Sequence, residues 1–300
     1  MSAPRPIKKV LIANRGEIAV RVIRAAHELG MRTVAVFSDA DRTAMHVRGA
    51  YEAVHIGPSA PAESYLRVDH IIEACKATGA DAVHPGYGFL AENSALVEGL
   101  AAAGITFVGP SVEAIQAMGD KVAARRTMIA NGVPVVPGTE LENADDPDSV
   151  RRAAAEVGYP LLVKASAGGG GKGMRLVREG EDVVEAVERA SSEAVTAFGD
   201  GTVYIERFVE EPRHIEVQVL AEDHGNTLAI GERECSVQRR HQKVIEETPS
   251  PAVSPELRAE MEQAAVAAAE ACDYRGAGTV EFLLGADGAF HFLEMNTRIQ

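Results

Sequence analysis

The sequence is poor in cysteine, and its few cysteines form no recognisable pattern. Only three occur in 300 residues, Cys75, Cys235 and Cys272, and they are widely spaced without a CxxC pair. An odd number of scattered cysteines argues against a disulfide framework, and the lack of paired Cys ligands argues against a zinc site. The cysteines therefore indicate reduced thiols and a cytoplasmic protein.

Positive charge is also scarce. The chain has 30 Lys and Arg against 44 Asp and Glu, which gives a formal net charge of -14. A phosphate backbone attracts clustered Lys and Arg and repels an acidic surface, so we expect no binding to nucleic acid. Taken alone, the basic stretch at residues 239–243 (RRHQK) would favour binding to nucleic acid, but the net negative charge of the chain argues against it.

The sequence lacks long apolar runs as well. The first nine residues contain no apolar core of a signal peptide, and no later stretch approaches the roughly 18 apolar residues of a membrane span. Residues 261–271 are rich in alanine, but Glu262 and Glu270 interrupt them, and their small side chains suit a helix packed against a sheet. We therefore expect no membrane segment.

The first third of the chain does contain a regular alternation of strands and helices. An apolar strand at residues 9–13 precedes a helix at about 17–29, which ends at Gly30, and a second strand at 33–37. The alternation continues with a helix at about 65–77, a strand at 82–84, a helix at 94–103 and a strand at 106–108. This order predicts a Rossmann-like domain over residues 1–108, with a parallel sheet covered by helices.

The pattern changes twice after residue 108. Residues 109–136 predict a helical linker, with one helix at 111–131 that leads into the turn-rich segment GVPVVPG. A helix at 147–157, strands at 161–164 and 174–177 and a helix within 181–192 predict a small α+β domain over residues 137–205. Strands such as 214–220 and 227–230 then follow one another through turns, which predicts a mainly antiparallel central sheet over residues 206–300. The expected fold class is α/β.

A glycine run lies between two of these strands. Residues 168–171 are all glycine, and Lys164 and Lys172 flank them. Such a loop exposes backbone N–H groups that can close over phosphate oxygens. A Walker A loop would need Ser or Thr after Lys172 and then a helix, and a dinucleotide-binding fingerprint would also need a helix. Strand, glycines and strand instead predict a hairpin flap, with a mobile turn that binds nothing as the alternative.

The last segment reads as a hairpin that turns at residues 285–288. If its loop has two or four residues, Glu281 faces an even-numbered residue, either Glu294 or Phe292. Glu281 and Glu294 then share one face of the sheet, directly opposed or diagonal at roughly 5–8 Å. Alternation adds Asn296 and, if the strand persists, Arg298 to that face. A loop of three or five residues would separate the two carboxylates.

Two carboxylates this close repel each other, so a cation between them is the economical explanation. An oxygen-seeking ion such as Mg²⁺ suits them, and Mg²⁺ usually accompanies ATP phosphates. The alternative is a solvated face that carries two Glu by chance. Strand register alone therefore predicts a metal site at Glu281 and Glu294.

Five motifs in order resemble the biotin carboxylase family of ATP-grasp ligases, the ATP-using component of acetyl-CoA, propionyl-CoA and pyruvate carboxylases. They lie at residues 12–19 (IANRGEIA), 84–93 (HPGYGFLAEN), 164–173 (KASAGGGGKG), 234–243 (ECSVQRRHQK) and 294–300 (EMNTRIQ), and the resemblance covers all 300 residues. It implies that ATP phosphorylates bicarbonate to carboxyphosphate, which releases CO2 beside the ureido nitrogen of biotin on a carrier domain. It also implies ATP with Mg²⁺ or Mn²⁺, a homodimer when the protein is intact, and a partner carboxyltransferase.

The same resemblance implies a role for each site residue. Lys121 and Lys164 would contact the ATP phosphates, and Gly170 and Gly171 would belong to the flap. The nucleotide pocket would comprise Glu206, Arg207, Phe208, Val209, His214, Gln238 and His241. Glu281, Glu294 and Asn296 would bind the metal. Lys243 and Arg298 would face bicarbonate, with Arg298 catalytic. Taken alone, Lys121 could be a solvated surface residue and His214 an ordinary strand histidine.

Three departures and two alternatives accompany the resemblance. Lys172 stands where many relatives carry Arg, Arg207 stands where many carry Lys, and Tyr51 occupies a position expected to be acidic. The family also continues beyond Gln300 with a Glu that acts as base and later an Arg near biotin, so turnover by these 300 residues is expected to be incomplete. A carbamoyl-phosphate synthase-like ligase and a non-catalytic nucleotide-binding module remain as alternatives.

Overall fold

The computed structural model describes residues 6–141, 143–166, 174–179, 181–239 and 242–300. The chain divides into two compact units. The first comprises Met1–Gln116, Tyr274–Gly278 and Thr297–Gln300, and the second comprises Ala117–Asp273 and Thr279–Asn296. The last strand of the chain therefore belongs to the second unit, whereas the residues that follow it belong to the first.

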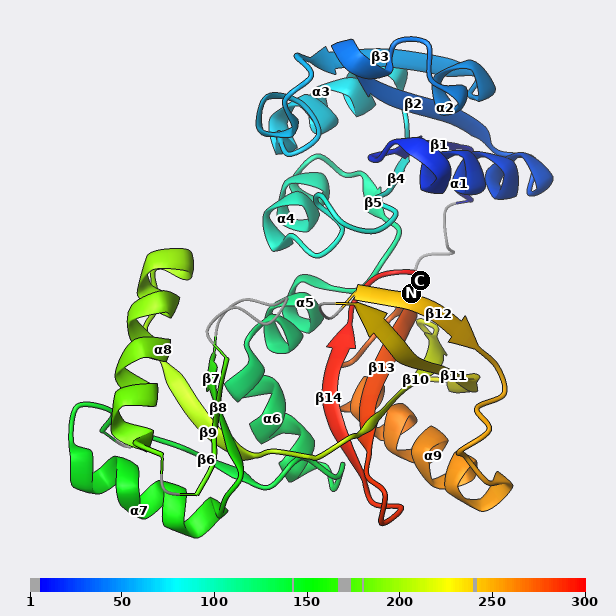
Figure 1. Cartoon of the computed structure of the whole chain (residues 1–300). Coiled ribbons are helices and arrows are strands. Elements are labelled where there is room, and N and C mark those ends of the chain that lie inside the picture. Colours follow the sequence, from blue (N-terminus) through cyan, green and yellow to red (C-terminus); the bar gives the residue numbers. More distant parts are fainter. Residues whose placement is uncertain (1–5, 142, 167–173, 180, 240–241) are drawn as a thin grey trace. The chain divides into compact units, whose positions relative to one another are not determined.

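The first unit is built on a parallel five-stranded sheet in the order β3-β2-β1-β4-β5 (Figure 1). Its strands are β1 (Lys9–Ile12), β2 (Arg32–Ser38), β3 (Glu52–Gly57), β4 (Ala82–His84) and β5 (Thr106–Phe107). Its helices are α1 (Gly16–Glu28), α2 (Met45–Gly49), α3 (Val68–Thr78) and α4 (Ser94–Ala102), with short 3-10 turns at Asp39–Asp41 and Pro61–Glu63.

Alternation along β1 explains why helices cover both faces of this sheet. Val10 and Ile12 pack with Ile18 and Val22 of α1, whereas Leu11 packs with residues of α3 and α4. A strand that is buried on both faces must be apolar at every position, as residues 10–13 are. The predicted parallel sheet with helices on its faces is confirmed.

The first unit contains a buried carboxylate, Asp41, with several hydrogen-bond donors. Asp41 accepts hydrogen bonds from Arg15 Nε at 2.6 Å and from Tyr65 Oη at 2.7 Å, and its neighbour Ser38 donates a further one. The Arg15 guanidinium, against the opposing effect of burial, lowers the pKa of Asp41 to about 2.

We expect Asp41→Asn to destabilise the first unit by about 2 kcal/mol at pH 7, because a carboxyl pKa of about 2 in the folded chain compares with 3.8 as its ordinary value. A depressed carboxyl pKa contributes stability above its unfolded value, and this contribution is lost as the pH falls from about 4 to 2. Urea unfolding across that range should therefore show a steeper acid decline in the wild type than in the variant. Parallel declines would contradict the assignment.

The second unit contains two sheets. The smaller has four strands in the order β6-β9-β7-β8, and each pair of neighbouring strands is antiparallel. Its strands are β6 (Gly138–Glu140), β7 (Leu161–Ala165), β8 (Arg175–Val177) and β9 (Val203–Arg207), and its helices are α7 (Pro147–Val157) and α8 (Val183–Phe198). Helix α6 (Lys121–Ala130) precedes them in the chain and contacts α9 (Pro255–Ala271) and β14 (Phe290–Asn296). Helices α7 and α8 cover this sheet through a core that includes Val150, Leu161, Val187 and Ile205.

The larger sheet has five strands in the order β12-β11-β10-β13-β14. The strands are β10 (Arg213–Ala221), β11 (Thr227–Arg239), β12 (Gln242–Glu247), β13 (Gly276–Leu284) and β14 (Phe290–Asn296). Helix α9 (Pro255–Ala271) packs against this sheet (Figure 1). Its buried side chains are small, such as Ala265 and Ala268, as the alanine-rich run predicted. The predicted fold class is confirmed.

Several predicted elements need correction. The single helix expected at 111–131 is two helices, α5 (Val112–Gly119) and α6, because Asp120 caps α6 by accepting hydrogen bonds from Val122 N and Ala123 N. Strands β3, β6 and β12 were not predicted. Two elements are longer than expected, since α8 reaches Phe198 and β11 reaches Arg239.

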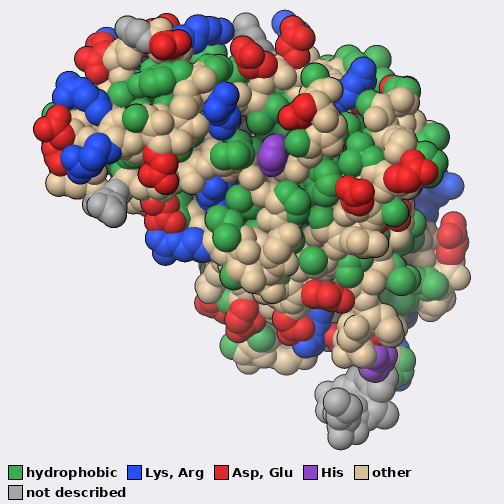
Figure 2. All heavy atoms as spheres, turned by 90° about the horizontal axis from the view of Figure 1, so that it is seen from below, with side chains coloured by type: hydrophobic (Ala, Val, Ile, Leu, Met, Phe, Trp, Pro, Cys, Tyr) green, Lys and Arg blue, Asp and Glu red, His purple; other side chains and the backbone are tan. Residues whose placement is uncertain are grey.

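Charged side chains of both signs lie on the surface (Figure 2). On the face in Figure 2, Lys and Arg side chains are interspersed with Asp and Glu. Among the described residues, no helix combines the length and apolar content that a membrane span requires.

Candidate functional site

Strand β10 supplies a polar face to the second unit. Ile215, Val217 and Val219 are fully buried on one side of the strand, while His214, Glu216 and Gln218 alternate with them. Glu216 has no exposed surface. A carboxylate in this position requires cationic or hydrogen-bonding partners, because burying an unpaired charge is costly.

The hairpin of β13 and β14 places Glu281 directly opposite Glu294. The expected loop length was wrong, because Leu284 pairs with Phe290 and leaves residues 285–289 as a five-residue loop. That loop would have separated the two carboxylates. A bulge between Glu281 and Phe282 shifts the register by one residue and restores the pairing. We refer to Glu281 and Glu294 as the carboxylate pair.

Glu281 is held by three side chains. Its Oε1 accepts hydrogen bonds from Lys243 Nζ and Asn296 Nδ2, both at 2.7 Å, and its Oε2 lies 2.6 Å from His214 Nε2. Burial alone would raise the pKa of Glu281, but His214 and Lys243 outweigh it and lower the pKa to about 2. Glu281 is therefore an anion at neutral pH.

Glu294 has a different environment. Burial and the neighbouring charge of Glu281 raise its pKa, although the charges of Lys121 and Lys164 act against this. The two members of the carboxylate pair thus differ, since donors stabilise one carboxylate and the other is held beside it at an electrostatic cost.

Lys243 links the carboxylate pair to a second buried anion. Its ammonium group donates to Glu216 Oε2 as well as to Glu281. Arg233 donates to the other oxygen of Glu216, and its NH2 group also donates to Gln218 Oε1 at 3.1 Å. Burial would lower the pKa of Lys243, but the charges of Glu281 and Glu216 outweigh it and raise the pKa.

Glu216 and Arg233 were not predicted from the sequence. A signal for them was present, since His214, Glu216 and Gln218 alternate with apolar residues and predict one polar strand face. Register then places Arg233 opposite Glu216.

Gln238 fixes the orientation of His214. Its amide nitrogen lies 3.0 Å from His214 Nδ1 and also donates to Cys235 O at 2.8 Å. A donor at Nδ1 leaves the proton on Nε2, which faces Glu281. His214 is therefore not an ordinary strand histidine.

Two predicted phosphate-binding lysines lie in the same unit. Lys164 Nζ donates to Glu206 Oε1 at 2.9 Å, and both side chains are at least nine-tenths buried. The charge of Glu206 outweighs burial and raises the pKa of Lys164. Burial instead lowers the pKa of Lys121, which is affected through space by Glu294 and Lys164. Lys121 is thus a partly desolvated residue and not a solvated surface lysine.

Asp120 joins the segments that carry these two lysines. The oxygen of Asp120 that caps α6 also accepts a hydrogen bond from Ser166 Oγ at 3.1 Å, and Lys121 N donates to Ser166 O at 3.4 Å. Ser166 follows Lys164 by two positions at the end of β7. These contacts hold two like charges near each other.

The predicted adenine segment, Glu206, Arg207, Phe208 and Val209, is partly committed to the fold. Arg207 N donates to Pro137 O and Phe208 N donates to Pro160 O. The Glu206 carboxylate is paired with Lys164. These contacts occupy the backbone N–H groups of Arg207 and Phe208 and the carboxylate of Glu206.

The prediction for Arg298 carries a condition. The sequence places Arg298 on the face of the carboxylate pair only if the strand persists, and strand β14 ends at Asn296, so that condition is not met. Arg298 belongs to the first unit, where NH1 donates to Gln300 Oε1 at 3.0 Å. Three further predicted site residues, Gly170, Gly171 and His241, lie outside the described residues.

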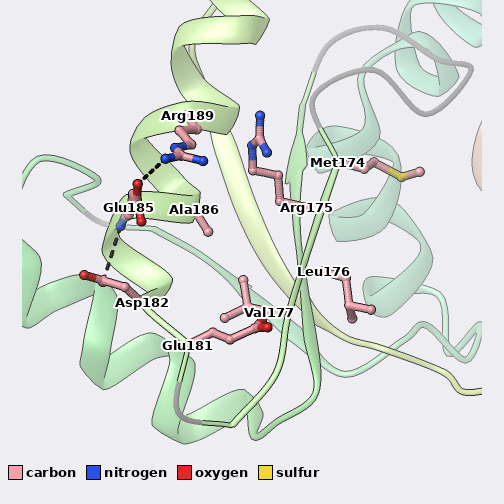
Figure 3. Close-up of a pocket in the computed structure, with 9 residues that line it drawn as sticks. All are labelled: Met174, Arg175, Leu176, Val177, Glu181, Asp182, Glu185, Ala186 and Arg189. Carbon is pink, nitrogen blue, oxygen red and sulfur yellow. Dashed lines mark hydrogen bonds and ion pairs between the residues drawn. The ribbon is translucent and has the colours of Figure 1, made fainter.

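A separate cavity of about 510 Å³ lies between β8 and α8 (Figure 3). Its arginines are already paired, Arg189 with Glu185 and Arg175 with Glu193. None of the residues that line it is a predicted site residue. The lining consists of Met174, Arg175, Leu176, Val177, Glu181, Asp182, Glu185, Ala186 and Arg189. The cavity gives no support to a nucleotide site there.

In the described part of the chain, two groups of side chains are candidate sites for a metal ion. In one, atoms of Glu216, Cys235 and Glu246 lie within 4.8 Å of one another. Arg233 and Lys243 already neutralise Glu216, and burial raises the pKa of Cys235 to about 12, so the thiol stays protonated. The carboxylate pair with the amide oxygen of Asn296 is the better donor set for Mg²⁺ or Mn²⁺, which prefer oxygen ligands.

A parallel α/β unit and a unit of two sheets, with one buried and two partly buried lysines and opposed carboxylates, are typical of an ATP-grasp protein. Two family models match the chain: biotin carboxylase, N-terminal domain, over residues 6–115, and carbamoyl-phosphate synthase L chain, ATP binding domain, over residues 120–300. The chain belongs to the biotin carboxylase family.

Individual relatives agree. The chain is 54% identical over 297 residues to biotin carboxylase 1 of Bacillus subtilis, covering 98% of this chain and 65% of the relative. It is 51% identical over 292 residues to the propionyl-CoA carboxylase alpha chain of Ruegeria pomeroyi, covering 97% and 43%. The chain therefore spans about two-fifths to two-thirds of the length of these relatives.

Solved structures give the same result. A complex of Campylobacter jejuni biotin carboxylase with β,γ-ATP superposes with a TM-score of 0.93 at 48% identity, covering 98% of this chain and 66% of that one. The biotin carboxylase domain dimer of Hydrogenobacter thermophilus 2-oxoglutarate carboxylase, in complex with MgADP, ADP and bicarbonate, gives a TM-score of 0.91 at 47% identity, covering 99% and 65%.

Proposed function

We propose that the chain is the ATP-using part of a biotin carboxylase. ATP would phosphorylate bicarbonate to carboxyphosphate, and the carboxyl group would then pass through CO2 to the ureido nitrogen of biotin on a carrier domain. The observation that carries the proposal is the carboxylate pair, which lies opposed within the same compact unit as Lys121, Lys164 and Lys243. This combination matches the needs of a phosphoryl transfer.

The charge and burial of Lys164 and Lys121 support a phosphate-binding role for both residues. Glu206 keeps Lys164 protonated and fixed in a buried position. Lys121 begins α6, and the Asp120–Ser166 contact brings the two chain segments together. Two preorganised cations in a site with little water would stabilise the negative charge of the transferred phosphoryl group. Gly170 and Gly171 would complete this part of the site as the flap.

Glu281, Glu294 and Asn296 would hold Mg²⁺ or Mn²⁺. Bound there, the ion would neutralise charge on the phosphate oxygens. The MgADP named in the Hydrogenobacter thermophilus structure supports this choice of cation. The nucleotide would also contact His214, Gln238 and His241, with its base edge against residues 206–209.

Lys243 and Arg298 would bind bicarbonate. Lys243 contributes a charge fixed by Glu216, and the guanidinium of Arg298 can bind a planar oxyanion in a bidentate manner. The proposed partners are a second copy of the enzyme, a biotin carrier domain and a carboxyltransferase. Similarity to the propionyl-CoA carboxylase alpha chain and to the biotin carboxylase domain dimer supports them.

The test is bicarbonate-dependent release of ADP from Mg-ATP by the native protein that carries these 300 residues. We expect free biotin to stimulate ADP release and to become carboxylated, while ammonium leaves the rate unchanged. Stimulation by ammonium instead would indicate a carbamoyl-phosphate synthase-like ligase. ATP binding without any bicarbonate-dependent cleavage would indicate a non-catalytic module. Either result would overturn the proposal.

A further inference from the structure

The side chains around Glu281 carry one more inference, which rests on the proposed metal site. Both oxygens of Glu281 are occupied by donors in this structure: Lys243 and Asn296 at Oε1 and His214 at Oε2. Asn296 can keep its N–H bond and still offer its amide oxygen to a metal. His214 is held by Gln238 and donates one hydrogen bond. Lys243 is different because it brings a full positive charge.

We propose that Lys243 is a resident counter-ion of Glu281 that competes with the divalent metal for that carboxylate. The ammonium lies 2.7 Å from Oε1 of Glu281, one of the two oxygens that this carboxylate can offer to a metal. A metal ion that binds the carboxylate pair must therefore displace Lys243 or accept a cation in contact with its own ligand.

Glu216 gives Lys243 a second partner to retain when Glu281 turns to the metal. Glu216 and Glu281 both accept a hydrogen bond from the ammonium group of Lys243. Arg233, on the neighbouring strand, pairs with Glu216 and holds it in place. Glu216 is fully buried and is paired with both Lys243 and Arg233, so its carboxylate stays inside the unit. Lys243 thus shifts between one partner and two, and the neighbouring Glu216 keeps it in the site.

Competition of this kind would keep metal affinity low until a nucleotide arrives. The phosphate oxygens of the nucleotide provide further ligands for the ion, and their negative charges interact with Lys121 and Lys164. The metal would then enter mainly as its ATP complex, and Lys243 would be released from Glu281 as bicarbonate binds. Lys243 would thus determine that the metal binds together with ATP and not before it.

The test measures Mn²⁺ affinity without nucleotide at a fixed neutral pH, using the electron paramagnetic resonance signal of free Mn²⁺. Lys243→Gln keeps a hydrogen-bond donor but removes the charge. We expect it to bind Mn²⁺ at least about tenfold more tightly than the wild type, because a unit charge near 4 Å acts strongly in a partly buried site. Lys243→Arg keeps the charge, so its affinity should stay within about threefold of the wild type.

Lys9→Met is the matched control. Lys9 is also 19% exposed in its side chain and also pairs with a carboxylate, Glu52, but it lies in the first unit. Its loss should leave Mn²⁺ affinity unchanged. A second readout guards against poor folding of Lys243→Gln: the rise in melting temperature on adding Mn²⁺ should be larger in this variant than in the wild type.

The two proposals fail in different ways. If Glu294→Gln abolishes Mn²⁺ binding but Lys243→Gln leaves the affinity unchanged or weaker, the metal site stands and the competition by Lys243 is overturned. If neither the wild type nor Lys243→Gln binds Mn²⁺, or if Glu294→Gln binds it as well as the wild type does, the proposed metal site is itself overturned.

Discussion

Replacing Lys164 with Met is expected to destabilise the second unit by about 3–5 kcal/mol and to remove Mg-ATP binding. The first effect arises because Lys164 and Glu206 form an ion pair with side chains only 8% and 7% exposed, and removing one partner leaves a buried charge. The second arises because Lys164 is a proposed phosphate ligand. Urea unfolding and calorimetric titration with Mg-ATP would measure the two effects separately.

A double variant separates the structural role of Lys164 from its role in binding. Lys164→Met with Glu206→Leu replaces the buried pair with apolar groups, which is often neutral for stability. We expect it to recover most of the lost stability but none of the Mg-ATP affinity. Recovered binding would show that Lys164 only neutralises Glu206. Lys9→Met is a control for loss of a more exposed pair, which should cost at most about 1 kcal/mol.

The parts of the fold that could be predicted are those in which one periodicity dominates. The strand at residues 9–13 is apolar at every position after Lys9, and its neighbours alternate with helices, so a parallel sheet covered on both faces followed directly. The break between α5 and α6 could not be read from apolar periodicity, because Asp120 ends one helical segment by capping the next. The carboxylate of Asp120 satisfies N–H groups that a continuous helix would have bonded to its own carbonyls.

The carboxylate pair shows how a correct outcome can depend on two compensating features. In a regular hairpin, Glu281 and Glu294 share a face only if the loop has two or four residues, and this loop has five. The bulge beside Glu281 supplies the missing shift. Neither feature is visible in the sequence, because GADG permits several turns and a bulge needs no special residue. The pairing therefore follows from tertiary constraint on the strand, and local turn chemistry does not determine it.

Glu216 and Arg233 mark the limit of inference from motifs. Their strands contain alternating polar residues, but whether that polar face meets solvent or a second layer is decided by the rest of the fold. Here it lies inside the second unit, and Glu216 is fully buried. The domain boundaries inferred from composition and the roles of all the predicted site residues stay predictions.

Replacing Glu294 with Gln is expected to make the metal-free protein more stable and to abolish its use of metal. Glu294 has a raised pKa because burial and Glu281 disfavour its charged form. A carboxyl group whose folded pKa lies above its unfolded value destabilises the fold above that unfolded value, near pH 4.5, and the penalty disappears in more acidic solution. Gln removes the charge, so we expect a gain of about 1 kcal/mol at pH 7 that vanishes below about pH 4.

The loss of function should be large, because a neutral amide is a poor substitute for a carboxylate ligand of Mg²⁺ or Mn²⁺. We expect Mn²⁺ and Mg-ATP affinities to fall at least about a hundredfold. Glu246→Gln is the control, since it removes an exposed member of the alternative acidic group and should change neither quantity. Unfolding curves at pH 4 and pH 7, with and without metal, would measure both effects. A stable variant that still binds metal would place the ion elsewhere. A destabilised variant would mean that favourable contacts hold Glu294 in the fold. The carboxylate pair would then carry no electrostatic cost for the metal to relieve.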